Sequence, residues 1–449
     1  MDLLSCSYGD NRNDKFLLKN WEGWPLNESV IFYKPIIKFQ NKYYCFVSYL
    51  LVQNLQPILE NLIREADSNY YSSKYLVIRK AYLENKSINY LAKMLPGAKI
   101  YKNLYYSIRE NGEQKRVELD GLILYDQNLL LIEAKSAPLS ISAQRGGVER
   151  IKRDVNEVIV GAYSQCKRAK DYIDIEATPC FYDAKDQLLV KIGDKKFFKN
   201  IFLINVTLDS FGILATHLSS IKAIGLLDGK EWPWSVYLND LRVISELIEF
   251  PSQFLHYLQS RIRINEFPQF ENMDELDIFG FYLKENLYFK EGELDDFTSV
   301  TLTGYTDEID NYYQSAGGIS EKKKPCQQFT MGFRKIINNI ELSKRPGFTI
   351  IVTKLLDFCG DSREEFAKQY ERVIRDTLKD HNMHNFSMLF NTKASFGFTV
   401  VGLYGIDKDA KSKWTSYCLA KKQKNKINSW FCLLVYVKDN HSIFDFLFA

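Results

Sequence analysis

The sequence lacks several features that mark membrane and secreted proteins. Its eight cysteines are scattered and include no C-x-x-C pair. The first residues, MDLLSCSYGD, do not read as a signal peptide. No apolar run approaches the roughly 18 residues that a membrane-spanning helix requires. We therefore expect a protein that has no membrane association and resides in a reducing cytoplasm.

A large excess of charge of one sign is also lacking. The chain has 59 Lys and Arg against 56 Asp and Glu, a formal net charge of +3. This excludes a histone-like polycation, so any contact with nucleic acid would need a local basic patch. The 449 residues, 46% hydrophobic and 26% charged, fit two or three globular domains without a long disordered region.

What the sequence does contain is an acidic hairpin. Residues 115–137, KRVELDGLILYDQNLLLIEAKSA, predict two strands joined by a polar Asp-Gln-Asn turn centred on residue 127. Cross-strand neighbours lie about 5 Å apart, so folding about this turn places Asp120 opposite Glu133 and Ala134. The two carboxylates are therefore expected to meet.

Alternation of side chains along each strand sets the faces of this hairpin. Glu133 and Lys135 share one face of their strand, and Glu118 and Asp120 share one face of the other. Two apolar sets are expected nearer the turn: Leu122, Leu124, Leu129 and Leu131 on the charged faces, and Val117, Leu119, Ile123, Leu130 and Ile132 on the opposite faces. The hairpin is thus predicted to be buried on both sides, with its charges at the end away from the turn.

Buried charges require a compensating partner. Two carboxylates with one lysine suit a divalent cation and an activated water. The alternative is an ordinary ion pair of Lys135 with Glu133 or Asp120 at the end of a half-exposed hairpin. The spacing D-x(12)-E-x-K does not by itself decide between them.

The segment ELDG, followed by a turn and LLLIEAKS, resembles the PD-(D/E)XK nuclease superfamily, specifically the branch with nuclease-related (NERD-type) domains. The resemblance covers roughly residues 75–206, and Leu119 stands at the position of the motif's proline, which many members of this branch lack. It implies an α/β fold with a restriction-endonuclease-like αβββαβ core. It also implies a phosphodiesterase that depends on Mg²⁺, with Mn²⁺ as a substitute, and a nucleic-acid substrate, for which DNA is our expectation.

The resemblance also implies roles for individual residues. Asp120, Glu133 and the carbonyl of Ala134 would hold the metal, and Lys135 would orient the attacking water. A helix before the sheet often lends a further carboxylate in this family, and Glu84 is the matching residue, with an exposed glutamate as the alternative. Gln165, on the helix after the hairpin, matches a catalytic helper in exonuclease-like branches.

The elements predicted around the hairpin follow the order of the αβββαβ core, and this prediction does not depend on the acidic motif. Periodicity predicts a helix over 71–95, a strand over 99–108, a long helix over 145–173 and an apolar strand over 200–208. Together with the hairpin, this gives helix, three strands, helix, strand.

The long helix carries a local excess of basic residues. Seven Lys and Arg against three acids lie between residues 145 and 170. We expect a nucleic-acid backbone to bind here, with a merely solvated face as the alternative. The expected ligands are Arg145, Arg150, Lys152, Arg153, Lys167 and Arg168. Gly146-Gly147 near the helix start would add free backbone N–H groups.

The remainder of the chain is divided by composition. We expect an N-terminal extension over 1–70, the nuclease core over 71–208, a helical extension over 209–270 and an α+β domain of unassigned role over 271–449. The extension is predicted to hold two strands around Gln40-Asn41 and a helix over 50–66. Pro251 is expected to start a helix whose Arg261 extends the basic surface or merely ends the helix. The last domain is predicted to contain strands over 347–353, 397–404 and 429–437 and helices over 363–380 and 408–424.

These observations lead to two expectations from different classes. The first is a metal-dependent nuclease, by analogy in prokaryotic defence against foreign DNA, with a homo-oligomer or a partner protein engaged through the C-terminal domain. The second is a catalytically retired fold that serves as a nucleic-acid or protein-interaction scaffold. Retirement should erode Asp120, Glu133 or Lys135 first, because buried charges without a metal are costly. All three are present.

Overall fold

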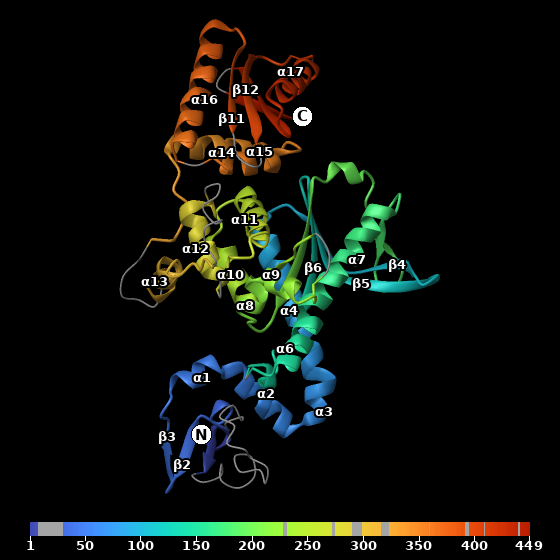
Figure 1. Ribbon diagram of the computed structural model, residues 1–449, viewed down its shortest axis with the longest axis vertical. Coiled ribbons are helices and arrows are strands. Elements are labelled where there is room, and N and C mark those ends of the chain that lie inside the picture. Colours follow the sequence, from blue (N-terminus) through green and yellow to red (C-terminus); the bar gives the residue numbers. More distant parts are fainter. Residues whose placement is uncertain are drawn as a thin grey trace.

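The computed structural model describes residues 1–7, 30–144, 146–227, 231–271, 274–289, 299–315, 323–358, 360–390, 395–407, 409–438 and 441–449. The described residues form a mixed α/β structure with three sheets, as the sequence predicts (Figure 1). An N-terminal sheet lies at the bottom of Figure 1, a seven-stranded sheet in the middle and a four-stranded C-terminal sheet at the top.

The seven-stranded sheet has the order β10-β9-β6-β5-β4-β7-β8. Its strands are β4 (Lys99–Glu110), β5 (Glu113–Tyr125), β6 (Asn128–Lys135), β7 (Cys180–Tyr182), β8 (Leu188–Lys191), β9 (Asn200–Thr207) and β10 (Trp234–Tyr237). Strands β4, β5 and β6 are antiparallel neighbours, whereas β9 runs parallel to β6. The predicted strands of this region are confirmed, and the short β7, β8 and β10 are additional to them.

Helices cover both faces of this sheet. Helix α4 (Leu76–Met94) packs on one face, preceded by the π-helical turn η4 (Tyr71–Tyr75). The other face is covered by α5 (Ile141–Gln144), α6 (Val148–Val155), the π-helical turn η5 (Asn156–Val160) and α7 (Gly161–Ile175). We call the two apolar layers the α4-side core and the α7-side core. The long helix was predicted to begin at residue 145 but begins at Val148, after Gly147.

The β5–β6 hairpin forms where the sequence predicts it. Asp126 occupies the left-handed region with φ of 48°, which a short polar side chain tolerates at a tight turn. Side chains of β6 are buried on both faces, with Leu129 to Ile132 fully inaccessible to solvent. Each such large apolar side chain contributes about 1.5–3 kcal/mol of burial free energy. The strand pair is therefore fixed from both sides.

The N-terminal sheet consists of β1 (Ser5–Ser7), β2 (Ile36–Phe39) and β3 (Lys42–Tyr44). The predicted turn at Gln40-Asn41 is confirmed, with both residues at positive φ. Short 3-10 turns η1 (Asp2–Leu4) and η3 (Val30–Phe32) accompany the sheet, and helices α1 (Tyr49–Gln53), α2 (Leu55–Ala66) and α3 (Ser68–Tyr70) connect it to η4. Pro57 lies in the first turn of α2, where a missing N–H breaks no helical hydrogen bond.

A helical layer follows the sheet. It comprises α8 (Ile213–Thr216), α9 (Leu218–Ala223), α10 (Leu238–Leu247), α11 (Pro251–Ile264), α12 (Glu275–Glu285), α13 (Asp307–Ser315), α14 (Met331–Ser343) and α15 (Phe348–Leu356). Pro251 starts α11, as predicted. The strand predicted over 347–353 is wrong, because these residues form α15. Its β-branched residues favour a strand locally, but a helix lets seven of its nine side chains be buried in the layer.

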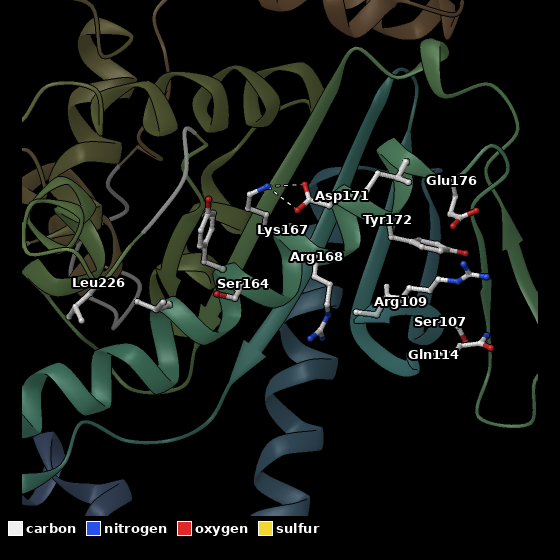
Figure 2. Close-up of a pocket in the computed structure, with 14 residues that line it drawn as sticks. Ser107, Arg109, Gln114, Ser164, Lys167, Arg168, Asp171, Tyr172, Glu176 and Leu226 are labelled. Carbon is white, nitrogen blue, oxygen red and sulfur yellow. Dashed lines mark hydrogen bonds and ion pairs between the residues drawn. The ribbon is translucent and has the colours of Figure 1, made fainter. Parts of the chain in front are cut away.

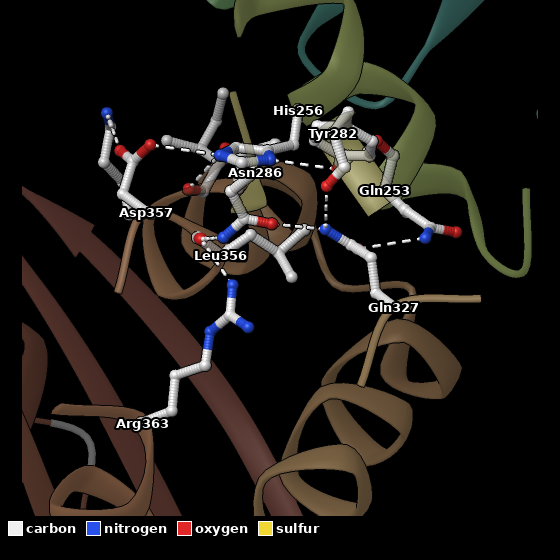
Figure 3. Close-up of polar contacts among 11 residues, drawn as sticks. Gln253, His256, Tyr282, Asn286, Gln327, Leu356, Asp357 and Arg363 are labelled. Atoms are coloured by element: carbon white, nitrogen blue, oxygen red, sulfur yellow. Dashed lines mark hydrogen bonds and ion pairs between the residues drawn. The ribbon is translucent and has the colours of Figure 1, made fainter. Parts of the chain in front are cut away.

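A buried polar network joins α11, α12 and the end of α15 (Figure 3). His256 lies with Nδ1 3.0 Å from the Tyr282 hydroxyl and Nε2 3.1 Å from Asp357 Oδ1. Lys354 donates to the second oxygen of Asp357 at 2.8 Å. Burial lowers the pKa of His256, although Asp357 opposes that shift. The network therefore holds the C-terminal end of α15 against α11.

The C-terminal sheet has the order β11-β12-β13-β14. Its elements are β11 (His384–Phe390), β12 (Phe396–Tyr404), β13 (Ser429–Lys438) and β14 (His441–Phe448), with helices α16 (Gly360–Asp380) and α17 (Ala410–Asn425). The strands predicted over 397–404 and 429–437 and the helices predicted over 363–380 and 408–424 are confirmed, and β11 and β14 are additional. Apolar side chains from α4 to β13 belong to one continuous cluster, so residues on both sides of position 270 share a core.

Candidate active site

The two central carboxylates converge at one end of the β5–β6 hairpin. Gly121 pairs with Ile132, which places Asp120 opposite Glu133. Asp120 Oδ2 accepts a hydrogen bond of 2.8 Å from the backbone N–H of Ala134. Only 5% of Asp120 and 1% of Glu133 are exposed. The predicted meeting of these two side chains is confirmed.

Lys135 completes the cluster. Its Nζ lies 3.5 Å from Glu133 Oε2 and donates a hydrogen bond to Oε1 of Gln165 on α7. Gln165 therefore points from the helix towards the sheet, as its position beside the apolar stripe predicts. A lysine held between a carboxylate and an amide oxygen has a fixed direction, which a freely rotating surface lysine lacks.

Burial disfavours the ionised form of both carboxylates. Burial, and then the charge of Asp120, raise the pKa of Glu133 to about 8, whereas Lys135 and the backbone N–H of Asp120 oppose the shift. Burial also raises the pKa of Asp120, against the Ala134 N–H and Lys135. Two adjacent buried carboxylates disfavour simultaneous ionisation, so the pair favours binding a proton or a metal cation.

One oxygen of Glu133 has no partner. Within the described residues, Oε1 is buried and forms no hydrogen bond, although Oε2 lies near Lys135. An unsatisfied buried carboxylate oxygen costs free energy unless a ligand occupies the position next to it. The orphaned oxygen therefore points to a missing ligand of positive charge or hydrogen-bonding capacity.

Glu84 approaches the pair from α4. Burial raises its pKa, and the charge of Asp120 raises it further. Lys80 Nζ forms an ion pair with Glu84 Oε1 at 3.3 Å, a contact without the geometry of a hydrogen bond. The expected location of Glu84 beside the acidic cluster is confirmed, but its own lysine partner already compensates its charge.

The oxygen atoms of the site suit a hard cation that takes only a few of its ligands from the protein. In the described part of the chain, no three His, Cys, Asp or Glu side chains lie close enough together to hold a metal ion. The carboxylates that do converge are those of Asp120 and Glu133, whereas the contact from Ala134 is its N–H donating to Asp120, so the carbonyl of Ala134 stays a predicted ligand. Mg²⁺ is commonly held by one or two carboxylates while it keeps several waters, so this set fits Mg²⁺ or Mn²⁺.

The alternation of side chains breaks at Asp120. The pairing of β4 with β5 passes from Lys102–Gly121 to Leu104–Leu119 and omits Asn103 and Asp120. Asn103 has a φ of 50°, outside the strand region. The faces of β5 change there, so the expected grouping of Val117 and Leu119 with Ile123, Leu130 and Ile132 is wrong. Val117 and Leu119 instead pack in the α7-side core with Leu122, Leu129 and Leu131.

Gly121 allows α4 to approach the site. A Cβ at this position would lie 2.9 Å from Ile88 Cδ1, closer than real Cβ atoms come to other heavy atoms. Ile88 is four residues after Glu84, so both side chains face the same way from α4. The glycine after Asp120 thereby permits the helix position that brings Glu84 near the carboxylate pair.

The predicted phosphate ligands are partly engaged by acidic neighbours. Arg150 Nε lies 3.1 Å from Asp154 Oδ1. Lys152 and Lys167 form similar ion pairs, with Glu149 at 3.0 Å and with Asp171 at 2.8 Å. Arg153 is exposed, and Arg145 lies outside the described residues. Phosphate binding along this helix stays a prediction.

Arg261 does not extend the basic surface. It is 1% exposed, and its Nε lies 2.9 Å from Glu275 Oε2. The Trp234 indole and the Tyr257 hydroxyl also donate to Glu275, at 2.7 and 2.6 Å. The expectation that Arg261 extends the basic surface is wrong, because the residue forms a buried ion pair that joins α11 to α12. Its place in the last turn of α11 agrees with the other alternative, a helix-end cation.

Tyr106 on β4 was missed by the sequence reasoning. Its hydroxyl is buried, and the guanidinium of Arg168 lies beside it. The pKa of this hydroxyl is raised to about 12, chiefly by burial. A hydrogen bond with Arg168 and the charge of Arg168 oppose the shift, and the charge of Glu133 adds to it. The available signal was an aromatic residue in a strand next to the acidic hairpin.

Comparisons of the chain with protein-family models, with curated proteins and with solved structures found no match. None of the helices in the described part of the chain has both the length and the apolar composition that crossing a bilayer requires. Functional inference therefore depends on the site's own geometry.

Proposed function

We propose that the protein is a metal-dependent nuclease that hydrolyses phosphodiester bonds, with DNA as the expected substrate. The observation that carries this proposal is Glu133. It is a fully buried carboxylate with a pKa of about 8 and one unpartnered oxygen, beside a second buried carboxylate and a lysine. Such perturbed groups cluster at functional sites, because maintaining them is costly for the fold.

The chain order supports a restriction-endonuclease-like core for this site. A helix, three antiparallel strands, a helix and a parallel strand succeed one another in α4, β4–β6, α7 and β9. The hairpin β7–β8 is inserted before the last strand. The carboxylates lie on the second and third strands, where the αβββαβ arrangement would place them.

Asp120, Glu133 and the carbonyl of Ala134 would hold Mg²⁺ or Mn²⁺, with Glu84 adjacent. A bound ion of this kind polarises a phosphoryl oxygen and lowers the pKa of its water. The protein's own contribution is a dry, rigid hairpin buried on both faces, which keeps the oxygen donors in place.

Lys135 would act on the reacting groups. Its ammonium, held by Gln165 and Glu133, can donate a hydrogen bond to the attacking water and offset the negative charge that grows on the phosphate oxygens. Gln165 would fix the direction of that ammonium. It is therefore a positioning residue in this scheme.

Nuclease activity can be tested directly with the full chain. Supercoiled plasmid, linear duplex, single-stranded DNA and RNA are each incubated with Mg²⁺, with Mn²⁺ and with EDTA. We expect degradation only with metal, and its loss in Asp120→Asn and Glu133→Gln. Glu149→Gln, which alters an exposed carboxylate on α6, is the matched control. Cleavage that persists in Asp120→Asn, or in EDTA, would contradict the proposal.

The rival proposal is a catalytically retired scaffold that binds nucleic acid or protein. Its support is that internal partners already satisfy Asp120 Oδ2 and Lys135 and that the described residues hold no three-ligand metal cluster. This scaffold would bind without degrading any of the four substrates. A role in defence against foreign DNA, with the C-terminal domain engaging a second copy or a partner protein, is proposed by analogy only.

A further inference from the structure

A groove of about 900 Å³ lies beside the candidate active site, between α7 and the arm formed by β4 and β5 (Figure 2). In Figure 2, Arg109 and Tyr172 lie on one side of the groove and Ser164 and Leu226 on the other, with Arg168 between them. No role assigned so far to the hairpin uses this groove. Its volume falls in the range of pockets that bind small organic molecules and nucleotides.

The groove is coupled in space to the carboxylate pair. Arg168 follows Gln165 by three residues on α7, so the two side chains share one side of the helix about one turn apart. Gln165 accepts a hydrogen bond from Lys135. The charges of Glu133 and Arg168 both shift the pKa of the Tyr106 hydroxyl, so this hydroxyl lies near both side chains. A ligand in the groove would therefore lie one helical turn from the catalytic lysine's partner.

Arginine side chains provide the charge of the groove. Arg168 Nε is shielded from solvent and has no hydrogen-bond partner within the described residues, while the same guanidinium also lies against the Tyr106 hydroxyl. Arg109 is exposed at the groove edge. Lys167 is already neutralised by Asp171 at 2.8 Å, and Glu176 lies near the far end. A guanidinium presents paired donors that match a phosphate group, so the arginines are the natural phosphate ligands.

A rigid aromatic wall faces these cations. The Tyr172 hydroxyl donates to the Cys180 carbonyl at 2.9 Å and accepts from its N–H at 3.1 Å. Its ring centroid lies 4.7 Å from that of Tyr106. Ser107, Gln114 and Ser164 supply hydrogen-bonding groups beside the apolar surface. Flat rings that carry polar edges, as nucleobases do, suit such a surface.

We infer that this groove binds one unpaired nucleotide of the strand to be cut, with the base against Tyr172 and the phosphate on Arg168 and Arg109. The inference rests on the proposed nuclease function and narrows its substrate to single-stranded nucleic acid or single-stranded ends. A nucleotide inside a double helix does not fit, because its base is paired and stacked and cannot lie against Tyr172. An unpaired nucleotide can enter because its base is free of a partner.

The test measures binding rather than cleavage. Fluorescence anisotropy follows a fluorescein-labelled oligothymidine, and a duplex of the same length, binding to the full chain in EDTA. We expect tighter binding of the single strand, weakened roughly tenfold by Arg168→Gln, as for loss of one charge-assisted contact. Ser164→Trp, which fills the groove from an exposed position, should weaken it as much. Lys170→Gln is the control, because Lys170 pairs with Asp174 and Glu231 and does not line the groove.

The outcomes separate this inference from the nuclease proposal. If the wild-type protein cuts DNA but both groove variants bind the single strand as it does, the groove inference fails and the nuclease stands. If nothing is cut but the groove variants lose single-strand binding, the nuclease proposal fails and the groove stands as a binding site. Preference for the duplex would overturn the groove inference. Unchanged thermal unfolding of each variant excludes misfolding as the cause.

Discussion

Asp126, at the turn of the β5–β6 hairpin, accepts a hydrogen bond of 2.7 Å from the backbone N–H of Gly347, 221 residues later. Its second oxygen accepts from the N–H and the hydroxyl of Thr349, at 3.1 and 2.6 Å. The hairpin turn thereby caps the N-terminus of α15, whose other end is held by His256 through Asp357. Helix α15 joins the hairpin to the C-terminal half of the protein.

This cap predicts a measurable contribution to stability. Asp126→Ala should lower the free energy of unfolding by about 1–3 kcal/mol, because it leaves three partly buried donors without their acceptor. Urea denaturation measures the change. Asp67→Ala is the control, since Asp67 caps the short exposed helix α3 through a single bond of 2.8 Å to Tyr70. Equal losses in the two variants would contradict the cap's structural role.

Lys135→Ala should abolish most turnover while the fold persists. In the proposed mechanism the lysine offsets the charge that grows on the phosphate, so its removal is expected to slow hydrolysis by roughly 10²–10³-fold. Thermal unfolding should change little, because a quarter of the side chain is exposed. Lys368→Ala, which removes an exposed lysine of α16 that pairs with Glu364, should cleave normally. Wild-type rates in Lys135→Ala would remove this residue from the mechanism.

Gln165 is expected to affect the rate of hydrolysis by orienting the ammonium of Lys135. Gln165→Leu is expected to reduce kcat by roughly tenfold, the effect of losing one orienting hydrogen bond, and to leave KM and metal affinity nearly unchanged. Gln165→Glu keeps an acceptor for the ammonium and should restore much of the rate. A purely structural role predicts loss of stability in both variants and no such rescue.

Stability should depend on pH through Glu133. Its pKa is raised to about 8 in the folded protein, so its contribution to stability is complete below about pH 4.5 and is lost as pH rises through 8. Without metal, the melting temperature should fall over this range. Burial likewise raises the pKa of Asp240 to about 8, so Glu133→Gln and Asp240→Asn should each reduce the slope.

Metal ions should distinguish these two groups. Mg²⁺ or Mn²⁺ competes with the proton on Glu133, so either ion should raise the melting temperature more strongly at pH 8 than at pH 5. The metal effect should persist in Asp240→Asn and vanish in Glu133→Gln. A metal effect that is the same in both variants would place the ion elsewhere.

The ion pair between Arg261 and Glu275 is expected to dominate the stability of the helical layer. Arg261→Ala should cost about 3–5 kcal/mol, because Glu275 would remain charged and buried without its partner. Arg334→Ala breaks a partly exposed pair with Glu249 at 3.0 Å and should cost less than about 1 kcal/mol. Denaturant titration of both variants tests the contrast.

The hairpin could be predicted because its signals are local. A polar turn, two apolar runs and the positions of three charges determine which residues meet, and Asp120, Glu133, Lys135 and Gln165 lie together as expected. Helix α4 and strand β9 were predictable for the same reason, since each carries its own periodic pattern. Local chemistry therefore predicts most of the carboxylate site.

Other features depend on distant residues. The segment of α15 has strand propensity, and its helix is stabilised by Asp126 and by packing on α11. Arg261 is buried because Glu275 lies on the next helix. Arg168 is linked to the carboxylate site through Tyr106, which lies on β4, two strands away from Glu133 on β6. Such pairings become visible only when segments remote in sequence are brought together.

The reversal of faces at Asp120 also limits how the site can be transferred. Asp120 faces its partners because Asn103 leaves the strand conformation on the neighbouring strand and Gly121 accepts the close approach of α4. Grafting only the acidic residues and the lysine onto a regular β-ribbon would point one carboxylate into the wrong layer. A designer who borrows this chemistry must therefore move the asparagine and the glycine together with the charges.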